Sequence, residues 1–248
     1  MKHPGTAKHG AAAALLALSL WPARAGEVPL YLMVVPPYTI NEPDRKGAGG
    51  DIALEALHRA GYAAQLQVVP NNRAIATVQA DGSRDTLIVP LARLKEREAG
   101  FTWVAPVARV RRAFFAAGRS VQSFDEARAA FRVVAVARGT AGLAILREQG
   151  FTDSQLYEVA DNITAARMLM LHRVDAWYGP VLQFRSWLKE VDPDHQLRMS
   201  ASLGSSVNYL ACSRNCDAQM RARLAEAVEQ MTRDGTIRTI EARYGVSD

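Results

Sequence analysis

Short apolar runs alternate with segments of helical period along most of this chain, and this alternation constrains its fold more than any other feature. Strand-like runs at residues 28–35, 63–70 and 85–91 are separated by helical patterns at 51–62 and 71–82. A β-α-β-α-β order is typical of an α/β sheet with right-handed crossover connections. The sequence therefore predicts an α/β fold.

The same order recurs farther along the chain. Strand-like runs cover residues 132–139, 154–160 and 174–180, and helical patterns cover 140–151 and 162–173. Two copies of one unit predict two α/β lobes that face each other. Convergence of ordinary β-α-β patterning is the alternative explanation of the repeat.

Extended segments lie between and after the two copies. Residues 101–118 and 205–213 are β-type and would join the lobes as a double-stranded hinge, while 217–245 has the pattern of two amphipathic helices broken at Asp234-Gly235. We expect these helices to pack back on the first lobe. The expected division places lobe 1 at 26–108 and 209–248 and lobe 2 at 109–208.

The first 25 residues have the pattern of a secretory signal peptide. Lys2 and Lys8 precede a short apolar run, and an Ala-x-Ala site ends at Ala25. The run is shorter than the roughly 20 apolar residues that span a bilayer, so a retained anchor is the weaker alternative. We expect cleavage after Ala25 and export of a soluble protein.

The charge of the chain does not indicate a nucleic acid or a membrane surface as a partner. The chain has 30 basic and 25 acidic residues, and three of the basic ones belong to the signal peptide. The tight basic cluster at 109–112 is interpreted as a solvated turn or strand edge. Without a concentrated basic face, neither nucleic acid nor a membrane surface is expected as a partner.

The two cysteines, Cys212 and Cys216, lie close together in the sequence. Export places them in an oxidising compartment, which favours a disulfide that pins a short loop. Two free thiols are the alternative. No histidine or further cysteine stands beside them, so no metal site is expected.

An ordered set of segments resembles the bacterial extracellular solute-binding proteins of family 3, the periplasmic receptors of polar amino-acid-type ABC importers. These segments cover nearly the whole chain after the signal peptide: "PPYTI", "GAGGDIALEAL", "NNRAIATVQADGSRDTLIVPLARLKEREAGFTWVAPV", "VAVARGTAGLAIL", "MLMLHRVDAWYGP" and "MTRDGTIRTIEARYG". The resemblance implies a two-lobed, type II Venus-flytrap fold with a two-stranded hinge. It also implies a periplasmic monomer without a cofactor, which binds a small molecule and has an ABC permease of the inner membrane as its partner.

Two residues flank the loop that follows the first strand. Tyr38 should lie at the carboxyl edge of the sheet, where it would either offer its ring and hydroxyl to a ligand or cap the core of lobe 1. Asp51 is expected in the first turn of the next helix, where an acid satisfies free N–H groups. Asp51 is therefore interpreted as structural.

The corner at Gly139 and Thr140 leads from a strand into a helix. Backbone N–H groups and a hydroxyl at such a corner suit a carboxylate, and the resemblance implies this use. A plain Thr140 N-cap is the alternative, and the two roles are compatible.

Arginines follow a strand of lobe 1. The resemblance implies that an arginine of this segment clamps the ligand's carboxylate, a geometry that a planar guanidinium suits. Arg93 and Arg97 both fit, and the choice between them stays open. Arg73, at the start of the helix at 71–82, is a further candidate.

This sequence departs from the amino-acid binders of the family in two places. Val89, Pro90 and Ala92 stand where those binders place serines. Gly179 and Pro180 stand where they place a second acid, which holds the ligand's ammonium. The missing ammonium partner argues against an α-amino-acid ligand.

Trp177 and Tyr178 come directly before that position in a predicted strand. They could line an aromatic or apolar pocket, although alternation along a strand should bury one of them. Asp175 is interpreted as a structural residue at the strand start, and not as a substitute for the missing acid.

The sequence therefore predicts a receptor that captures a small polar, carboxylate-bearing ligand between two lobes and delivers it to an ABC-type importer. A periplasmic sensor without a transport role is one alternative. An enzyme similar to cyclohexadienyl dehydratases is another, but it needs a cleft acid with a raised pKa, and no acid stands out in the sequence. We expect a binding protein and not an enzyme.

Overall fold

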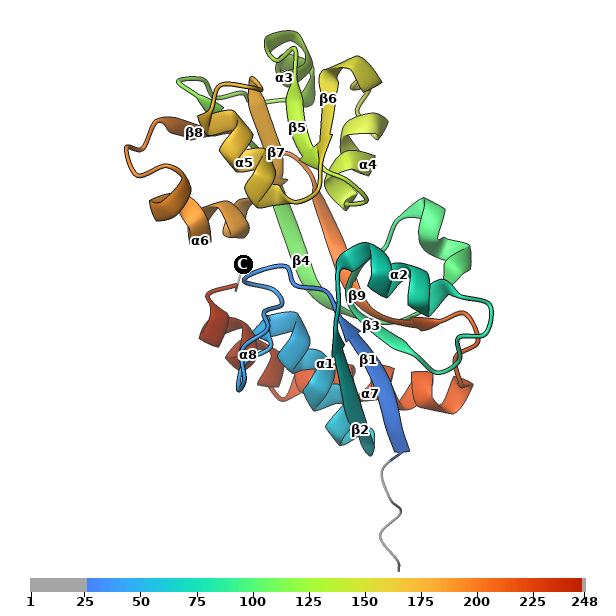
Figure 1. Ribbon diagram of the computed structural model, residues 1–248. Helices are drawn as coiled ribbons and strands as arrows, with labels where there is room; N and C mark the ends of the chain where they lie inside the picture. The colour runs from blue at the N-terminus through green and yellow to red at the C-terminus, as the bar shows by residue number, and fades with distance from the viewer. Residues whose placement is uncertain (1–25, 247–248) are drawn as a thin grey trace, which may run out of the picture.

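Two α/β lobes are joined by two long strands in the computed structural model, which describes residues 26–246 (Figure 1). The strands β4 (Phe101–Ala117) and β9 (Ser205–Ser213) run antiparallel to each other and pass from one lobe into the other. The predicted two-lobed fold with a double-stranded hinge is confirmed. The predicted signal peptide at 1–25 lies outside the described residues.

Lobe 1 has a sheet in the order β2-β1-β3-β9-β4, in which β1 is parallel to β2 and β3. The helices that follow β9 return to this lobe and pack against α1, as predicted. Its further elements are β1 (Gly26–Leu32), α1 (Gly47–Arg59), β2 (Tyr62–Val68), α2 (Asn71–Gln79), β3 (Leu87–Ala92), the 3₁₀ segment η1 (Lys95–Gly100), α7 (Ala218–Arg233) and α8 (Thr236–Tyr244).

Lobe 2 continues the strand order as β4-β7-β5-β6, with β8 paired to β4. Four of its elements, α3, η2, α6 and β8, were not predicted. Its elements are α3 (Phe124–Ala130), β5 (Val134–Ala137), α4 (Ala141–Glu148), the 3₁₀ segment η2 (Asp153–Gln155), β6 (Leu156–Val159), α5 (Asn162–Met170), β7 (Ala176–Pro180), α6 (Val181–Val191) and β8 (Leu197–Met199). The predicted division at 108/109 and 208/209 falls within the two hinge strands and stays a proposal.

The lobe 2 sheet is buried on both faces. Trp177 packs against Phe115 at a ring distance of 4.7 Å, and its neighbour Tyr178 packs on the other face against Phe114, also at 4.7 Å. Both side chains are fully buried. The prediction that alternation buries only one was wrong, because helices cover both faces of this sheet.

The loop after β1 is tied to the C-terminal helix. Helix α1 begins at Gly47, four residues earlier than the predicted helix, so Asp51 does not lie in its first turn. The Asp51 carboxylate accepts the Lys46 N–H at 3.0 Å and the Tyr244 hydroxyl at 2.6 Å. Asp51 is therefore structural, but it acts by joining the loop to α8.

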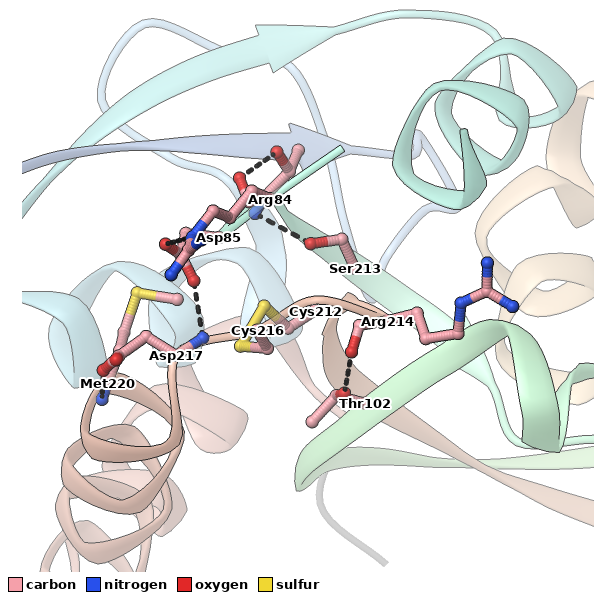
Figure 2. The surroundings of a disulfide bond; sticks show 10 residues. Arg84, Asp85, Thr102, Cys212, Ser213, Arg214, Cys216, Asp217 and Met220 are labelled. Atoms are coloured by element: carbon pink, nitrogen blue, oxygen red, sulfur yellow. Dashed lines mark hydrogen bonds and ion pairs between the residues drawn. A yellow bond between two sulfur atoms is a disulfide. The ribbon is translucent and has the colours of Figure 1, made fainter. Parts of the chain in front are cut away.

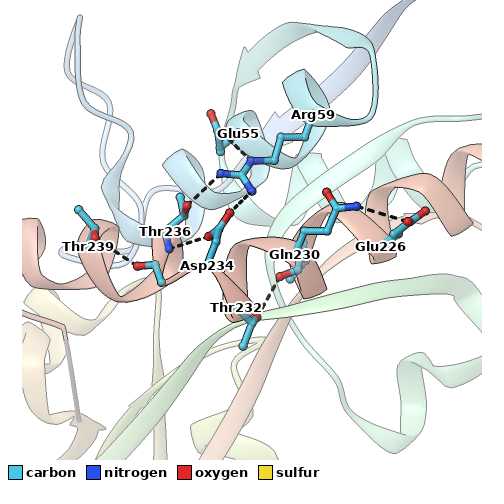
Figure 3. Close-up of polar contacts among 10 residues, drawn as sticks. Glu55, Arg59, Glu226, Gln230, Thr232, Asp234, Thr236 and Thr239 are labelled. Carbon is cyan, nitrogen blue, oxygen red and sulfur yellow. Dashed lines mark hydrogen bonds and ion pairs between the residues drawn. The ribbon is translucent and has the colours of Figure 1, made fainter.

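A second polar network joins α1 to the break between α7 and α8 (Figure 3). The Arg59 guanidinium donates to Asp234 Oδ2 at 2.6 Å and to Thr236 Oγ1 at 2.9 Å. The helix break at Asp234-Gly235 is as predicted, and Gly235 takes a left-handed conformation with a φ of 82°. Hydrogen bonds from the Thr236 side chain and from Arg59 lower the pKa of Asp234 to about 2.

A disulfide joins Cys212, in β9, to Cys216, just before α7, with a Cα–Cα distance of 5.9 Å (Figure 2). Beside it, Asp217 caps α7 by accepting the Met220 N–H at 2.8 Å, and Asp85 accepts the Asp217 N–H. The bridge therefore fixes the turn from the hinge strand into α7. Between residues 26 and 246, no helix has the length and apolar character needed to cross a membrane.

Candidate functional site

A cleft of about 770 Å³ opens between the two lobes. Its walls are the segments that follow β1, β2 and β3 in lobe 1 and those that follow β5, β6 and β7 in lobe 2. Val110 and Arg112 of β4 and Asn208 of β9 also line it, so the hinge strands contribute to the cleft. Ligands of open α/β sheets bind at the carboxyl ends of strands, which makes this cleft the candidate site.

The lobe 1 wall is mostly apolar. Its polar members are Asn71 and Asn72, at the start of α2, and Arg97 in η1. The apolar lining residues on this side are Met33, Val34, Val35, Pro36, Val68, Val69, Pro70, Ile75, Pro90 and Ala92. This wall therefore offers shape and one cation.

The lobe 2 wall is built around the corner between β5 and α4. The Thr140 hydroxyl donates to the Ala137 carbonyl at 2.8 Å and does not cap α4, so the first-turn N–H groups of α4 have no side-chain cap. Gly139 takes a φ of 66°, which favours glycine, and both Gly139 and Thr140 line the cleft. A helix N-terminus of this kind favours an anion.

Arg97 connects the two walls. Its Nη1 donates to the Ala92 carbonyl at 3.2 Å, and its Nη2 donates to the Gly139 carbonyl of lobe 2 at 2.8 Å. Burial lowers the pKa of Arg97, while neighbouring Glu96 acts in the opposite direction. The guanidinium still carries its charge at neutral pH.

Arg93 does not line the cleft. It forms an ion pair with Glu98, with a 2.8 Å distance between Nε and Oε1, and lies 5.5 Å from the ring centres of Trp103 and Tyr209. The hydrogen bond to Glu98 raises the pKa of Arg93. Of the two arginines that the sequence left open, the structure brings only Arg97 to the cleft.

Arg112 is a cleft residue that the sequence analysis missed. The interpretation of residues 109–112 as a solvated turn or edge was wrong for this position, because the segment lies within β4 and Arg112 is only 5% exposed. Its Nη1 donates to Ser206 Oγ at 2.8 Å and to the Val110 carbonyl at 3.2 Å. The period of two along a strand, which turns Arg111 outward and Arg112 inward, was the available signal.

Within the described part of the chain, no carboxylate lies within ion-pair distance of Arg112. Burial lowers the pKa of Arg112, and the neighbouring Tyr178 and Tyr38 act in the opposite direction. Both are tyrosines, and neither is a carboxylate. The lining therefore holds a buried cation without a partner acid.

Of the four remaining residues predicted to bind the ligand, only one lines the cleft. Tyr38 is buried in the loop after β1, Arg73 is exposed on α2, and Trp177 is in the lobe 2 core; none of the three lines the cleft. Tyr178 does line it, but its hydroxyl donates to the Leu203 carbonyl at 2.6 Å, and burial raises its pKa. Contact of any of these residues with a ligand stays a prediction.

Acids contribute little to the described lining. Asp161 is the one carboxylate there, and its Oδ1 caps α5 by accepting the Thr164 N–H at 2.8 Å. Asp175 lies outside the cleft and accepts the N–H groups of Arg132 and Val133 at 2.7 and 2.9 Å, which is the structural role predicted for it. A third cleft arginine, Arg138, is paired with Glu158 at 3.4 Å.

Comparison with solved structures shows the same fold in proteins of low sequence identity. A histidine kinase sensor domain with similarity to periplasmic binding proteins has a TM-score of 0.77 at 17% identity, covering 89% of this chain and 96% of that one. EhuB in complex with hydroxyectoine gives 0.76 at 20% identity, with 90% and 89% covered. An ancestral arginine-binding protein bound to arginine gives 0.74 at 16% identity, with 89% and 99% covered.

Comparison with curated proteins found no match. The family comparison is decisive, because the family described as bacterial extracellular solute-binding proteins, family 3, matches residues 32–247, nearly all of the chain after the predicted signal peptide. The resemblance stated from the sequence is confirmed. This chain belongs to the bacterial extracellular solute-binding proteins of family 3 and is a solute-binding protein.

Proposed function

We propose that the protein captures a small carboxylate-bearing molecule between its lobes in the periplasm and delivers it to an ABC-type importer. The observation that carries this proposal is the position of Arg97, which faces the uncapped N-terminus of α4 across the cleft. A guanidinium and a helix N-terminus both favour a carboxylate, the first through paired hydrogen bonds and the second through its N–H groups. A cleft of about 770 Å³ is in the range of small-molecule sites.

Closure of the lobes would follow from contacts on both sides of the ligand. Arg97 comes from lobe 1 and the Gly139–Thr140 corner from lobe 2, so an anion held by both would stabilise the closed arrangement over an open one. The strands β4 and β9 would act as the hinge. Discrimination between ligands then depends on how well one molecule satisfies both walls.

The cleft supports binding more than catalysis. General acid catalysis needs a carboxyl group placed for proton transfer, and the described lining offers only Asp161, which caps α5. A sensor role keeps the same ligand site and changes the partner. The likeness to a histidine kinase sensor domain supports this second candidate, while membership in the extracellular solute-binding proteins of family 3 supports delivery to a permease.

Calorimetric titration of residues 26–248 with carboxylates, amino acids, polyamines and prephenate tests the proposal. We expect carboxylates to bind, and Arg97→Ala to weaken binding by about 10-fold to 100-fold, the range for a hydrogen bond to a charged group. Arg93→Ala is the matched control, because this arginine lies outside the cleft lining and should leave the dissociation constant unchanged. Binding of polyamines without carboxylates would refute the anion site, and slow consumption of prephenate would indicate an enzyme.

A further inference from the structure

Two arginines lie at opposite ends of the corner between β5 and α4. Arg97 donates to the carbonyl of Gly139, at the start of the corner. Arg112 lies at its other end, where its Nε would be 3.5 Å from a β-carbon placed on Gly142. The first-turn N–H groups of α4, which have no side-chain cap, begin within the same segment. One short segment of lobe 2 is therefore flanked by two separate guanidinium groups.

Burial of the charged Arg112 side chain lowers the stability of the ligand-free protein. A buried cation loses its hydration, and a partner of opposite charge normally offsets that loss. Arg112 has hydrogen bonds to a hydroxyl and a carbonyl, but no partner carboxylate among the described residues. A negatively charged group on the ligand would supply the missing partner.

The cleft also lacks a place for an ammonium group. Asp161, the acid of the described lining, is held in the cap of α5, and Gly179 and Pro180 line the cleft at the carboxyl end of β7. An ammonium placed there would add a further positive charge beside Arg97 and Arg112, neither of which forms an ion pair with a carboxylate among the described residues. Repulsion between like charges therefore disfavours an amino group on the ligand.

We propose that the ligand is a short dicarboxylate without an amino group, with one carboxylate on Arg97 and the other on Arg112. This inference rests on the proposed function and narrows its substrate class. Two separate carboxylates fit better than one compact dianion, because the guanidinium groups contact different ends of a four-residue corner. Arg112 thereby sets specificity, while Arg97 provides the general attraction for a carboxylate.

Calorimetry on residues 26–248 with glutarate, valerate, glutamate and inorganic phosphate tests this assignment. We expect glutarate to bind at least about 30-fold tighter than valerate, the factor for one buried charge pair, and tighter than glutamate. Arg112→Gln should remove the preference for glutarate over valerate and leave valerate binding nearly unchanged. A role limited to folding would weaken both acids equally.

Arg111→Gln is the matched control, since this neighbour in β4 is exposed and should preserve the preference. Arg112→Lys, which keeps the charge, should retain part of it, and thermal unfolding verifies that each variant is folded. Equal affinity for glutarate and valerate, with Arg97 still required, would overturn the dicarboxylate assignment and leave the carboxylate site intact. Tighter binding of glutamate, or of phosphate alone, would overturn the assignment as well. Binding of none of these anions by the unaltered protein would instead count against the proposed function.

Discussion

The two walls of the cleft are built from the same β-α-β unit but present different chemistry. Lobe 1 presents mainly apolar side chains from the segments after β1 and β2, and lobe 2 presents backbone and polar groups from the segments after β5 and β6. Two lining arginines form no ion pair with a carboxylate of the described residues: Arg97 lies in η1 and Arg112 in the hinge strand β4. A repeated scaffold can therefore divide recognition: the lobe 1 wall supplies an apolar surface and Arg97, and the lobe 2 wall supplies backbone N–H groups and polar side chains.

The segment between β1 and α1 in lobe 1, which lies behind the cleft wall, should tolerate little change in its backbone. Gly47 has a φ of 80°, and a β-carbon there would lie 2.6 Å from Thr39 Cα and from the Tyr38 carbonyl oxygen. We expect Gly47→Ala to lower the free energy of unfolding by about 2–4 kcal/mol, measured by urea denaturation. Gly61→Ala is the control, with a φ of 81° and no atom within 4 Å, and should lose only about 1 kcal/mol. Equal losses of unfolding free energy in the two variants would show that the loop at Tyr38 and Thr39 shifts to make room for the added β-carbon.

The charge of Arg112, in the hinge strand β4, should lower the free energy of unfolding of the ligand-free protein. Arg112→Met removes a buried cation that has no partner acid between residues 26 and 246, at the loss of two hydrogen bonds. We expect the free energy of unfolding of the ligand-free protein to rise by about 1 kcal/mol, measured by thermal or urea unfolding. Arg97→Met, on the lobe 1 side, is the comparison and should change stability less, because Arg97 is less buried. A loss above about 2 kcal/mol for Arg112→Met would mean that the guanidinium supports the fold.

The smallest expected effects are changes of stability with pH. They differ between the lobes, since lobe 1 should respond on the acid side and lobe 2 on the alkaline side. In lobe 1, the pKa of Asp234 is lowered to about 2, so its contribution is present above about pH 4, the unfolded value, and is lost as the pH falls toward 2. In lobe 2, burial raises the pKa of Tyr178, so its contribution is present below about pH 10 and is lost as the pH rises further. Stability measured against pH should flatten on the acid side in Asp234→Asn and on the alkaline side in Tyr178→Phe. If Asp234→Asn left the acid side of the curve unchanged, or Tyr178→Phe the alkaline side, the replaced residue would not be the cause of the pH dependence there.

The sequence predicted elements well where periodicity alone decides them, and predicted side chains poorly where neighbouring elements decide. The two β-α-β units, the hinge strands and the helix break at Gly235 follow from local patterns. Arg112 did not, because the period of two separates Arg111 from Arg112 but does not tell which of the two faces of the strand will be covered. Arg93 and Arg97 could not be separated, because their directions depend on contacts with Trp103, Tyr209 and lobe 2.

The pairing of the hinge strands has a consequence for how such a receptor can diversify. Arg109 of β4 faces Val207 of β9 in the ladder, so the chain enters and leaves lobe 2 at adjacent points. Both described ends of the chain, β1 and α8, belong to lobe 1. Lobe 2 is thus an insertion with neighbouring ends, a cassette that could be exchanged between relatives as one piece. Such an exchange would replace the lobe 2 wall and Arg112 together, while lobe 1 would keep its apolar wall, Arg97 and the C-terminal helices.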